Sequence, residues 1–250
     1  MKQDIVRIAV AVVLGGAATL SQAATVYFSD WAYGDSWGNT VDVGVPNYSN
    51  VPTGGFKGSV TFNNTEKSAG FSDILNNNFI SYCVELTESF YGFPSAQMTG
   101  YDVVSANSYS TWDTAKATRL GQLVSYVKSN SQLVDTKDES TSLQLAIWNV
   151  VYDLATDNSV LTGNFKEKTV GGRFNAYANK LLTDSLNAVN KYDVFVLTKT
   201  SSQDFLLLRE KGGSTTTGVG NVPEPSSLAL AFAALGALGF ASRRRVASKA

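Results

Sequence analysis

Cys83 is the single cysteine of the chain, and the sequence contains no histidine. The missing histidines exclude Ser-His-Asp and Cys-His catalysis, histidine general bases and histidine metal sites. A single cysteine also excludes an internal disulfide. Where the compartment permits disulfides, an odd cysteine forms an intermolecular bridge or remains a reactive thiol. The chemistry open to this chain therefore centres on one thiol, and we expect no metal and no cofactor.

A second motif follows Cys83 at domain-scale spacing. Cys83 lies in the run Tyr82-Cys83-Val84-Glu85 inside a predicted strand, and Gln144 and Trp148 lie near the start of the clearest predicted helix. This strand, followed by a Gln-x-Ala-Ile-Trp helix, resembles the thioester domains of bacterial surface adhesins. The resemblance implies that the Cys83 sulfur condenses with the Gln144 carboxamide, that ammonia leaves, and that an internal thioester is stored.

The chemistry of a thioester explains these residue types. A thiolate is the nucleophile, and an amide is such a poor electrophile that its carbonyl carbon must be held about 3 to 3.5 Å away. A strand and a helix N-terminus supply that rigidity, and N–H groups at the helix start are expected to stabilise the oxyanion. Tyr82 and Trp148 are expected to exclude water. The stored thioester then acylates an amine on a target surface.

The same residues also have plainer interpretations. A free cysteine often packs as a small buried hydrophobe, Gln144 can be a helix surface residue, and Trp148 fits a core stripe by spacing alone. Glu85 and Glu88 either tune the thiol or form a solvated edge. Three alternatives stay open: a thioester-domain fold with the bond formed, the same fold without the bond, and an unrelated β-rich surface domain.

The C-terminal residues form a three-part pattern. Pro223, Glu224 and Pro225 precede an apolar run at 228–241, and a basic stop follows, made of Arg243, Arg244 and Arg245. The pattern resembles the PEP-CTERM sorting tail of Gram-negative bacteria, here residues 222–250. The resemblance implies recognition and processing by an exosortase, a membrane-embedded transpeptidase-like enzyme.

The length of the apolar run suits a transient membrane segment. Fourteen residues span roughly 21 Å as a helix, against about 30 Å of hydrocarbon. We therefore expect residues 228–241 to enter the inner membrane during sorting. An ordinary C-terminal anchor is the alternative.

The N-terminus predicts export. Residues 1–23 combine Lys2 and Arg7, an apolar stretch at 8–20 and a small-x-small site ending at Ala23. This is the pattern of a secretory signal peptide, with an uncleaved N-terminal anchor as the alternative. The expected route is an inner-membrane intermediate, then the cell surface or extracellular matrix of a Gram-negative bacterium.

Between the signals, residues 24–211 are enough for one domain with a sizeable core, and a Gly/Ser/Thr linker follows at 212–221. This body carries fourteen basic and nineteen acidic residues, a net charge of −5. It has no basic run with interleaved aromatics. No nucleic-acid partner is therefore expected.

The body is predicted as strands, then helices, then strands. Strands are expected at 25–28, 41–45, 58–62, 78–85 and 101–105, and as a hairpin of 194–197 with 205–208. Helices are expected from Asp113, from caps at 140–142, and over 173–190. Loops are expected at 49–55, 157–172 and 199–204. The pattern favours an α+β fold, a single domain with an antiparallel sheet or barrel core and a helical insertion.

Together these features predict an exported surface or matrix-associated, adhesin-like protein. Its Cys83–Gln144 thioester would attach it covalently to an amine-bearing surface or matrix polymer. It is not expected to be a turnover enzyme, because each domain would react once. The alternative is a non-covalent structural or carbohydrate-binding component of an exopolysaccharide or biofilm matrix.

Overall fold

The computed structural model describes residues 23–44, 47–88, 90, 93, 97–110, 112–153, 155–169 and 171–212. Apart from Ala23 and Gly212, the predicted signal peptide, linker and sorting tail lie outside the described residues, including the apolar run at 228–241. None of the helices in the described ranges is both long enough and apolar enough to span a membrane.

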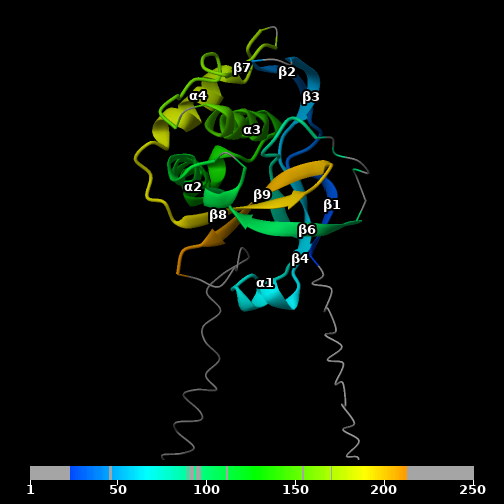
Figure 1. Ribbon diagram of the computed structural model, residues 1–250. Helices are drawn as coiled ribbons and strands as arrows, with labels where there is room; N and C mark the ends of the chain where they lie inside the picture. The colour runs from blue at the N-terminus through cyan, green and yellow to red at the C-terminus, as the bar shows by residue number, and fades with distance from the viewer. Residues whose placement is uncertain are drawn as a thin grey trace, which may run out of the picture. The chain divides into compact units, whose positions relative to one another are not determined.

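The main sheet has six antiparallel strands in the order β5-β4-β1-β6-β8-β9 (Figure 1). In chain order the strands are β1 (Ala24–Trp31), β4 (Phe56–Thr61), β5 (Ile74–Ser81), β6 (Gln97–Ser105), β8 (Tyr192–Lys199) and β9 (Ser202–Glu210). Ala24, Val26 and Phe28 alternate with less buried residues along β1, because successive side chains of a strand point to opposite faces. The buried face of the sheet forms much of the core.

The sheet curls until its two ends meet beside Cys83. The segment 82–84, just after the edge strand β5, pairs with the opposite edge strand β9. The Val84 N–H donates to the Asp204 carbonyl at 3.1 Å, and the Leu206 N–H donates to the Tyr82 carbonyl at 3.0 Å. This contact closes the sheet into a half-barrel with Cys83 at its seam. Cys83 was predicted inside a strand over 78–85, but β5 ends at Ser81.

A second, three-stranded sheet has the order β3-β2-β7. Its strands are β2 (Trp37–Val43), β3 (Asn47–Thr53) and β7 (Phe165–Glu167). The predicted loops at 49–55 and 157–172 were therefore wrong in part, since each contains a strand. Their polar composition is typical of loops, and both segments are extended because they pair with β2.

Three longer helices form the insertion between β6 and β8. They are α2 (Thr114–Ser129), α3 (Lys137–Tyr152) and α4 (Asn175–Asp184); α1 (Asn64–Ser68) is a short helix between β4 and β5. Asp113 caps α2, as predicted. The predicted caps at 140–142 were wrong, because Thr136 and Glu139 form a capping box one turn earlier. Helix α4 ends at Asp184, short of the predicted end at 190.

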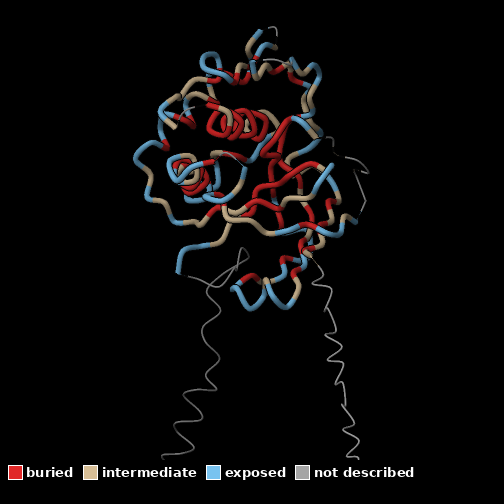
Figure 2. The backbone as a smooth tube through the Cα atoms, in the orientation of Figure 1, coloured by how far each residue is buried: buried red, intermediate tan, exposed pale blue. Residues whose placement is uncertain are grey.

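Helix α3 is the central helix of the domain. Nearly its whole length is buried (Figure 2), including every residue of 140–151. It contacts α2 and α4 as well as the three-stranded sheet. The sequence predicted one apolar face on this helix. Because other elements pack around its whole circumference, residues on all of its faces are buried.

The hairpin of β8 and β9 has a tight turn. Lys199 pairs with Ser202, and Ser201 adopts a positive φ of 61°, which lets the chain reverse within two residues. The predicted loop at 199–204 was therefore too long. The predicted α+β class is confirmed, with a curled antiparallel sheet as the core and a helical insertion.

Candidate functional site

Cys83 and Gln144 face each other at the seam of the half-barrel. The Cys83 N–H donates to Gln144 Oε1 at 3.0 Å, and Gln144 Nε2 donates to the Cys83 carbonyl at 2.8 Å. Both residues are buried. The two bonds close a ring that contains Cys83 Cα, the atom that bears the thiol side chain. The structure thus brings together the two residues that the sequence singled out, which are 61 positions apart.

The spacing of residues on α3 directs Gln144 to the seam. Ser140, Gln144 and Trp148 are four residues apart, so they share one face of the helix. Ser140 Oγ accepts a hydrogen bond from the Gly55 N–H at 2.8 Å and lies 3.3 Å from the Tyr82 hydroxyl. One helix face therefore fixes Gly55, Tyr82 and Cys83 together.

The predicted oxyanion donors were misplaced. Gln144 lies two turns into α3, so N–H groups at the start of the helix do not reach its carbonyl. The donor to Gln144 Oε1 is instead the N–H of Cys83 itself. The difference arises because α3 begins at Lys137 and not near Gln144.

A cleft of about 430 Å³ opens beside the pair. Its lining includes Cys83 and five aromatic side chains, which are Trp31, Phe56, Phe90, Phe93 and Trp148. The rings contact one another closely, with Trp31 4.5 Å and Phe90 5.0 Å from Phe56 between ring centroids. Much of the cleft wall is therefore apolar, which limits the access of water along that wall.

The polar part of the cleft includes Glu85, Glu88 and Gln203. Glu85 Oε2 accepts hydrogen bonds from the Thr87 N–H, the Thr87 hydroxyl and the Glu88 N–H, and Glu85 Oε1 accepts one from Gln203 Nε2 at 3.0 Å. Glu85 is buried whereas Glu88 is half-buried. A solvated edge is therefore wrong for Glu85, whose carboxylate is fixed in position.

Electrostatics keep the thiol protonated. Burial and, secondarily, the Glu85 carboxylate raise the pKa of Cys83 well above its ordinary value. No cationic side chain of the described residues lines the cleft to oppose this shift. The attack of the sulfur on a carbonyl therefore needs a group that accepts the thiol proton.

The other predicted residues take different positions. Trp148 lines the cleft, as a sheltering residue should, whereas Tyr82 packs on the Ser140 side and is not among the described residues that line it. Sequence reasoning missed Gln203 and most of the aromatic wall. The sequence did carry a signal for Glu85. It follows Cys83 by two residues, and side chains two residues apart in an extended segment point to the same side. The predicted sorting residues lie outside the described part of the chain.

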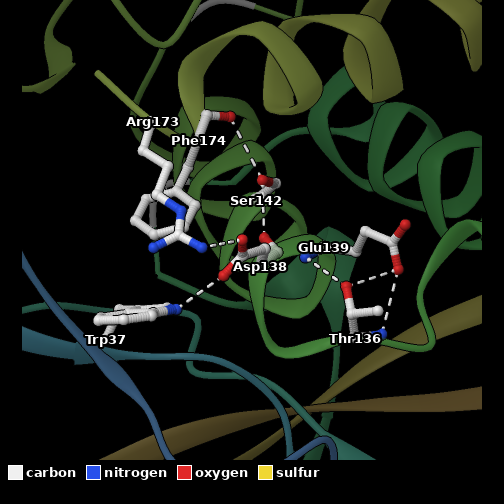
Figure 3. Close-up of polar contacts among 7 residues, drawn as sticks. All are labelled: Trp37, Thr136, Asp138, Glu139, Ser142, Arg173 and Phe174. Carbon is white, nitrogen blue, oxygen red and sulfur yellow. Dashed lines mark hydrogen bonds and ion pairs between the residues drawn. The ribbon is translucent and has the colours of Figure 1, made fainter. Parts of the chain in front are cut away.

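A cluster around Trp37 fixes the start of α3 (Figure 3). Trp37 Nε1 donates to Asp138 Oδ1 at 2.8 Å, and Arg173 forms an ion pair with Asp138 Oδ2 at 2.5 Å. The Lys137 ammonium lies 3.8 Å from the Trp37 ring centroid, and the Arg173 guanidinium lies 4.8 Å from it. These contacts join β2 to α3 and to the residues before α4. They hold the helix that carries Gln144.

Within the described ranges, no group of three or more cysteine, aspartate and glutamate side chains has the geometry to hold a metal ion. The polar side chains that line the cleft are those of Ser49, Asn50, Glu85, Glu88 and Gln203. Acyl transfer between sulfur and carboxamide requires no metal ion.

Two comparisons with known proteins bear on these features. Residues 221–245 match the PEP-CTERM protein-sorting motif. The motif marks an exported protein that passes through the membrane to the cell surface, and it implies processing by an exosortase-type enzyme. The predicted sorting tail is thereby confirmed.

The solved thioester domain of the Staphylococcus aureus TIE protein is similar to this chain, with 13% identity, a TM-score of 0.36, and coverage of 77% of this chain and 79% of that one. The thioester-domain resemblance that the sequence showed thus has a counterpart among solved structures. Because the TM-score is below 0.5, the contacts of Cys83 and Gln144 carry the proposals below. No curated protein sequence matches the chain.

Proposed function

We propose that this exported protein stores an internal thioester between Cys83 and Gln144 and uses it for covalent attachment to amine-bearing partners. The observation that carries the proposal is the pair of hydrogen bonds between the Gln144 carboxamide and the Cys83 backbone, made beside a cleft that Cys83 lines. This arrangement supports a role as a surface or matrix-associated, adhesin-like protein of a Gram-negative bacterium.

The storage step balances without a co-reactant. The Cys83 sulfur attacks the Gln144 side-chain carbonyl carbon, the C–S bond forms and the C–N bond breaks. The thiol proton ends on the departing nitrogen, which leaves as ammonia. During the attack, negative charge develops on Gln144 Oε1, which the Cys83 N–H stabilises at the distance expected of an oxyanion donor.

Release of the stored bond would attach the protein to its target. A primary amine attacks the same carbon, an amide forms at Gln144, and Cys83 returns to the thiol. Each domain reacts once, so the protein acts as a single-use acylating agent. The amine-bearing partner is proposed to be a surface or matrix polymer.

Mass spectrometry of the exported protein tests the proposal. Loaded protein should weigh less than the Cys83→Ser variant by one ammonia, after allowance for the substitution. Methylamine should then add one methylamine to the loaded protein, at Gln144. A native mass equal to that of the unloaded chain, unchanged by methylamine, would refute the stored thioester.

A second candidate is a non-covalent structural component of an exopolysaccharide matrix. One observation favours it: both polar atoms of the buried Gln144 carboxamide have a hydrogen-bond partner, so Gln144 needs no chemistry to be explained. The same mass measurement separates the two candidates, because this one predicts no loss of ammonia.

A further inference from the structure

We propose that the Glu85 carboxylate receives the alkylammonium group of the attacking partner and relays a proton from it to the departing Cys83 sulfur. The inference rests on the proposed function and names the residue that selects the attacking group. It assigns the cleft to primary amines on slender alkyl chains, such as a lysine side chain or a diamine.

The position of Glu85 beside the thiol is the first argument. Glu85 follows Cys83 by two residues, and both line the same cleft. The carboxylate is fixed by hydrogen bonds from Thr87, Glu88 and Gln203, so it loses little conformational entropy when a partner binds to it. A fixed carboxylate next to the reacting sulfur is placed for proton transfer.

The two carboxylate oxygens of Glu85 differ in how many further hydrogen bonds they can accept. Oε2 already accepts three hydrogen bonds. Among the described residues Oε1 accepts one, from Gln203 Nε2. A carboxylate oxygen has two lone pairs, so Oε1 retains one for an incoming N–H group. Glu85 therefore offers an incoming N–H group one acceptor whose carboxylate is held in position.

The charge and shape of the cleft favour an alkylammonium ion. Among the described lining residues the carboxylates are Glu85 and Glu88, and none is a cation. Aromatic faces such as those of Trp31 and Phe56 also attract cations. Apolar walls accept the methylene groups of an alkyl chain and offer few partners for the hydroxyls of a sugar.

The relay balances the bonds and protons of the release step. An alkylammonium ion binds at Glu85 and loses one proton to solvent. The neutral amine attacks the Gln144 carbonyl carbon, the C–N bond forms and the C–S bond breaks. The second proton passes from the nitrogen to Glu85 and on to the Cys83 sulfur, which leaves as a thiol.

The electrostatic environment fits this role. Burial is the largest influence on the pKa of Glu85 and raises it above its ordinary value, against the hydrogen bonds from Thr87 and Glu88. The pKa of the Cys83 thiol is also raised, by burial first and Glu85 second. A thiolate at this site is therefore a poor leaving group unless it is protonated as it departs.

The test compares two nucleophiles on the loaded, exported protein. Methylamine is a cation at pH 7, so it must lose one proton before it attacks and a second as the amide forms. Hydroxylamine is uncharged at this pH and loses only the second proton. In Glu85→Gln we expect capture of both nucleophiles to slow, because each passes one proton through Glu85; capture of methylamine should slow more, by about 100-fold, because its ammonium form also binds there. Glu88→Gln is the matched control, because it removes the same charge from the same cleft; its ratio of the two rates should match the wild type.

Each outcome has a distinct meaning. If the wild type never loses ammonia, the proposed function fails whatever Glu85 does. If the wild type loads but Glu85→Gln captures both nucleophiles at the wild-type rates, the relay is refuted and the thioester stands; if both rates fall by the same factor, binding of the ammonium group at Glu85 is refuted. If Glu85→Gln does not load, Glu85→Asp is measured instead, since its shorter carboxylate should still slow capture of methylamine by about ten-fold; unchanged rates there also refute the relay.

Discussion

The Gln144 side chain pairs with Cys83 as a neighbouring β-strand would. The peptide groups flanking Cys83 bond to β9 through Tyr82 and Val84, and the N–H and carbonyl of Cys83 itself point the other way, toward the Gln144 amide. The seam segment is thus paired on both sides, on one by a strand and on the other by a single side chain. Gln144 therefore has a structural role as well as the proposed chemical one.

Gln144→Met should destabilise the fold by about 2 kcal/mol, because it leaves a buried N–H and a buried carbonyl of Cys83 without partners. Methionine keeps most of the volume, so the loss reports on the two hydrogen bonds. The comparison is made by urea unfolding in a Cys83→Ser background, which cannot form the thioester. A loss below about 0.5 kcal/mol would contradict the pairing.

The free-thiol form should lose stability as the pH rises above about 8.5, the ordinary pKa of a cysteine. Because the pKa of Cys83 is raised in the folded state, the folded protein keeps the proton that the unfolded chain releases. The free energy of unfolding should then fall by up to about 1.4 kcal/mol per pH unit.

This pH dependence distinguishes the two forms of the site. Methylamine-treated protein, with its thiol restored, should show the slope between about pH 8.5 and 10. Loaded protein and Cys83→Ser should lack it, since neither has a thiol to titrate. Buried tyrosines such as Tyr82 and Tyr101, whose pKa values burial also raises, affect all three samples alike above this range.

Iodoacetamide should modify Cys83 only slowly in any folded form, because the residue is 6% exposed. Slow labelling of native protein therefore says nothing about the thioester. In denaturant at pH 7, Gln144→Met should accept one label at once, and loaded wild type should accept none until the thioester is cleaved. Equal labelling of both in denaturant would contradict the stored bond.

Ser140→Ala should cost about 1 to 2 kcal/mol, because the buried Gly55 N–H loses its acceptor. It should also lower the fraction of protein that loads, since Ser140 lies one turn before Gln144 on the same helix face. Ser142→Ala is the matched control. Its hydroxyl bonds to Asp138 and Phe174 away from the seam, so loading should stay at the wild-type level.

Trp37→Phe should cost about 1 kcal/mol by removing the hydrogen bond to Asp138 while keeping a ring beneath Lys137. Because Lys137 and Arg173 already contact the ring, we expect matrix oligosaccharides to leave Trp37 fluorescence unchanged. A saturable change in fluorescence that Trp37→Phe abolishes would favour the carbohydrate-binding alternative.

Local patterns in the sequence predicted most elements of the fold. Aromatic and β-branched runs between turn signals identified β1 and β6, and Asp113, one of two cap candidates with Thr111, marks the start of α2. Strand β3 was missed because its mostly exposed polar side chains are typical of a loop, and its extended conformation comes from pairing with β2. The N-terminus of α3 was misplaced because Ser140, Thr141 and Ser142 resemble caps, although all three are buried inside the helix.

One thiol and no histidine, read from the chain alone, limit the side chains that are available for chemistry. The sorting motif can be read in the same way, because it is encoded in one contiguous segment at 221–245. Three relationships come from the folded structure instead: Cys83 and Gln144 meet, the Cys83 N–H faces the carboxamide, and Glu85 is buried near them. These are contacts between the end of an edge strand and the middle of a helix, and their existence depends on how the sheet curls and closes, which local spacing does not encode.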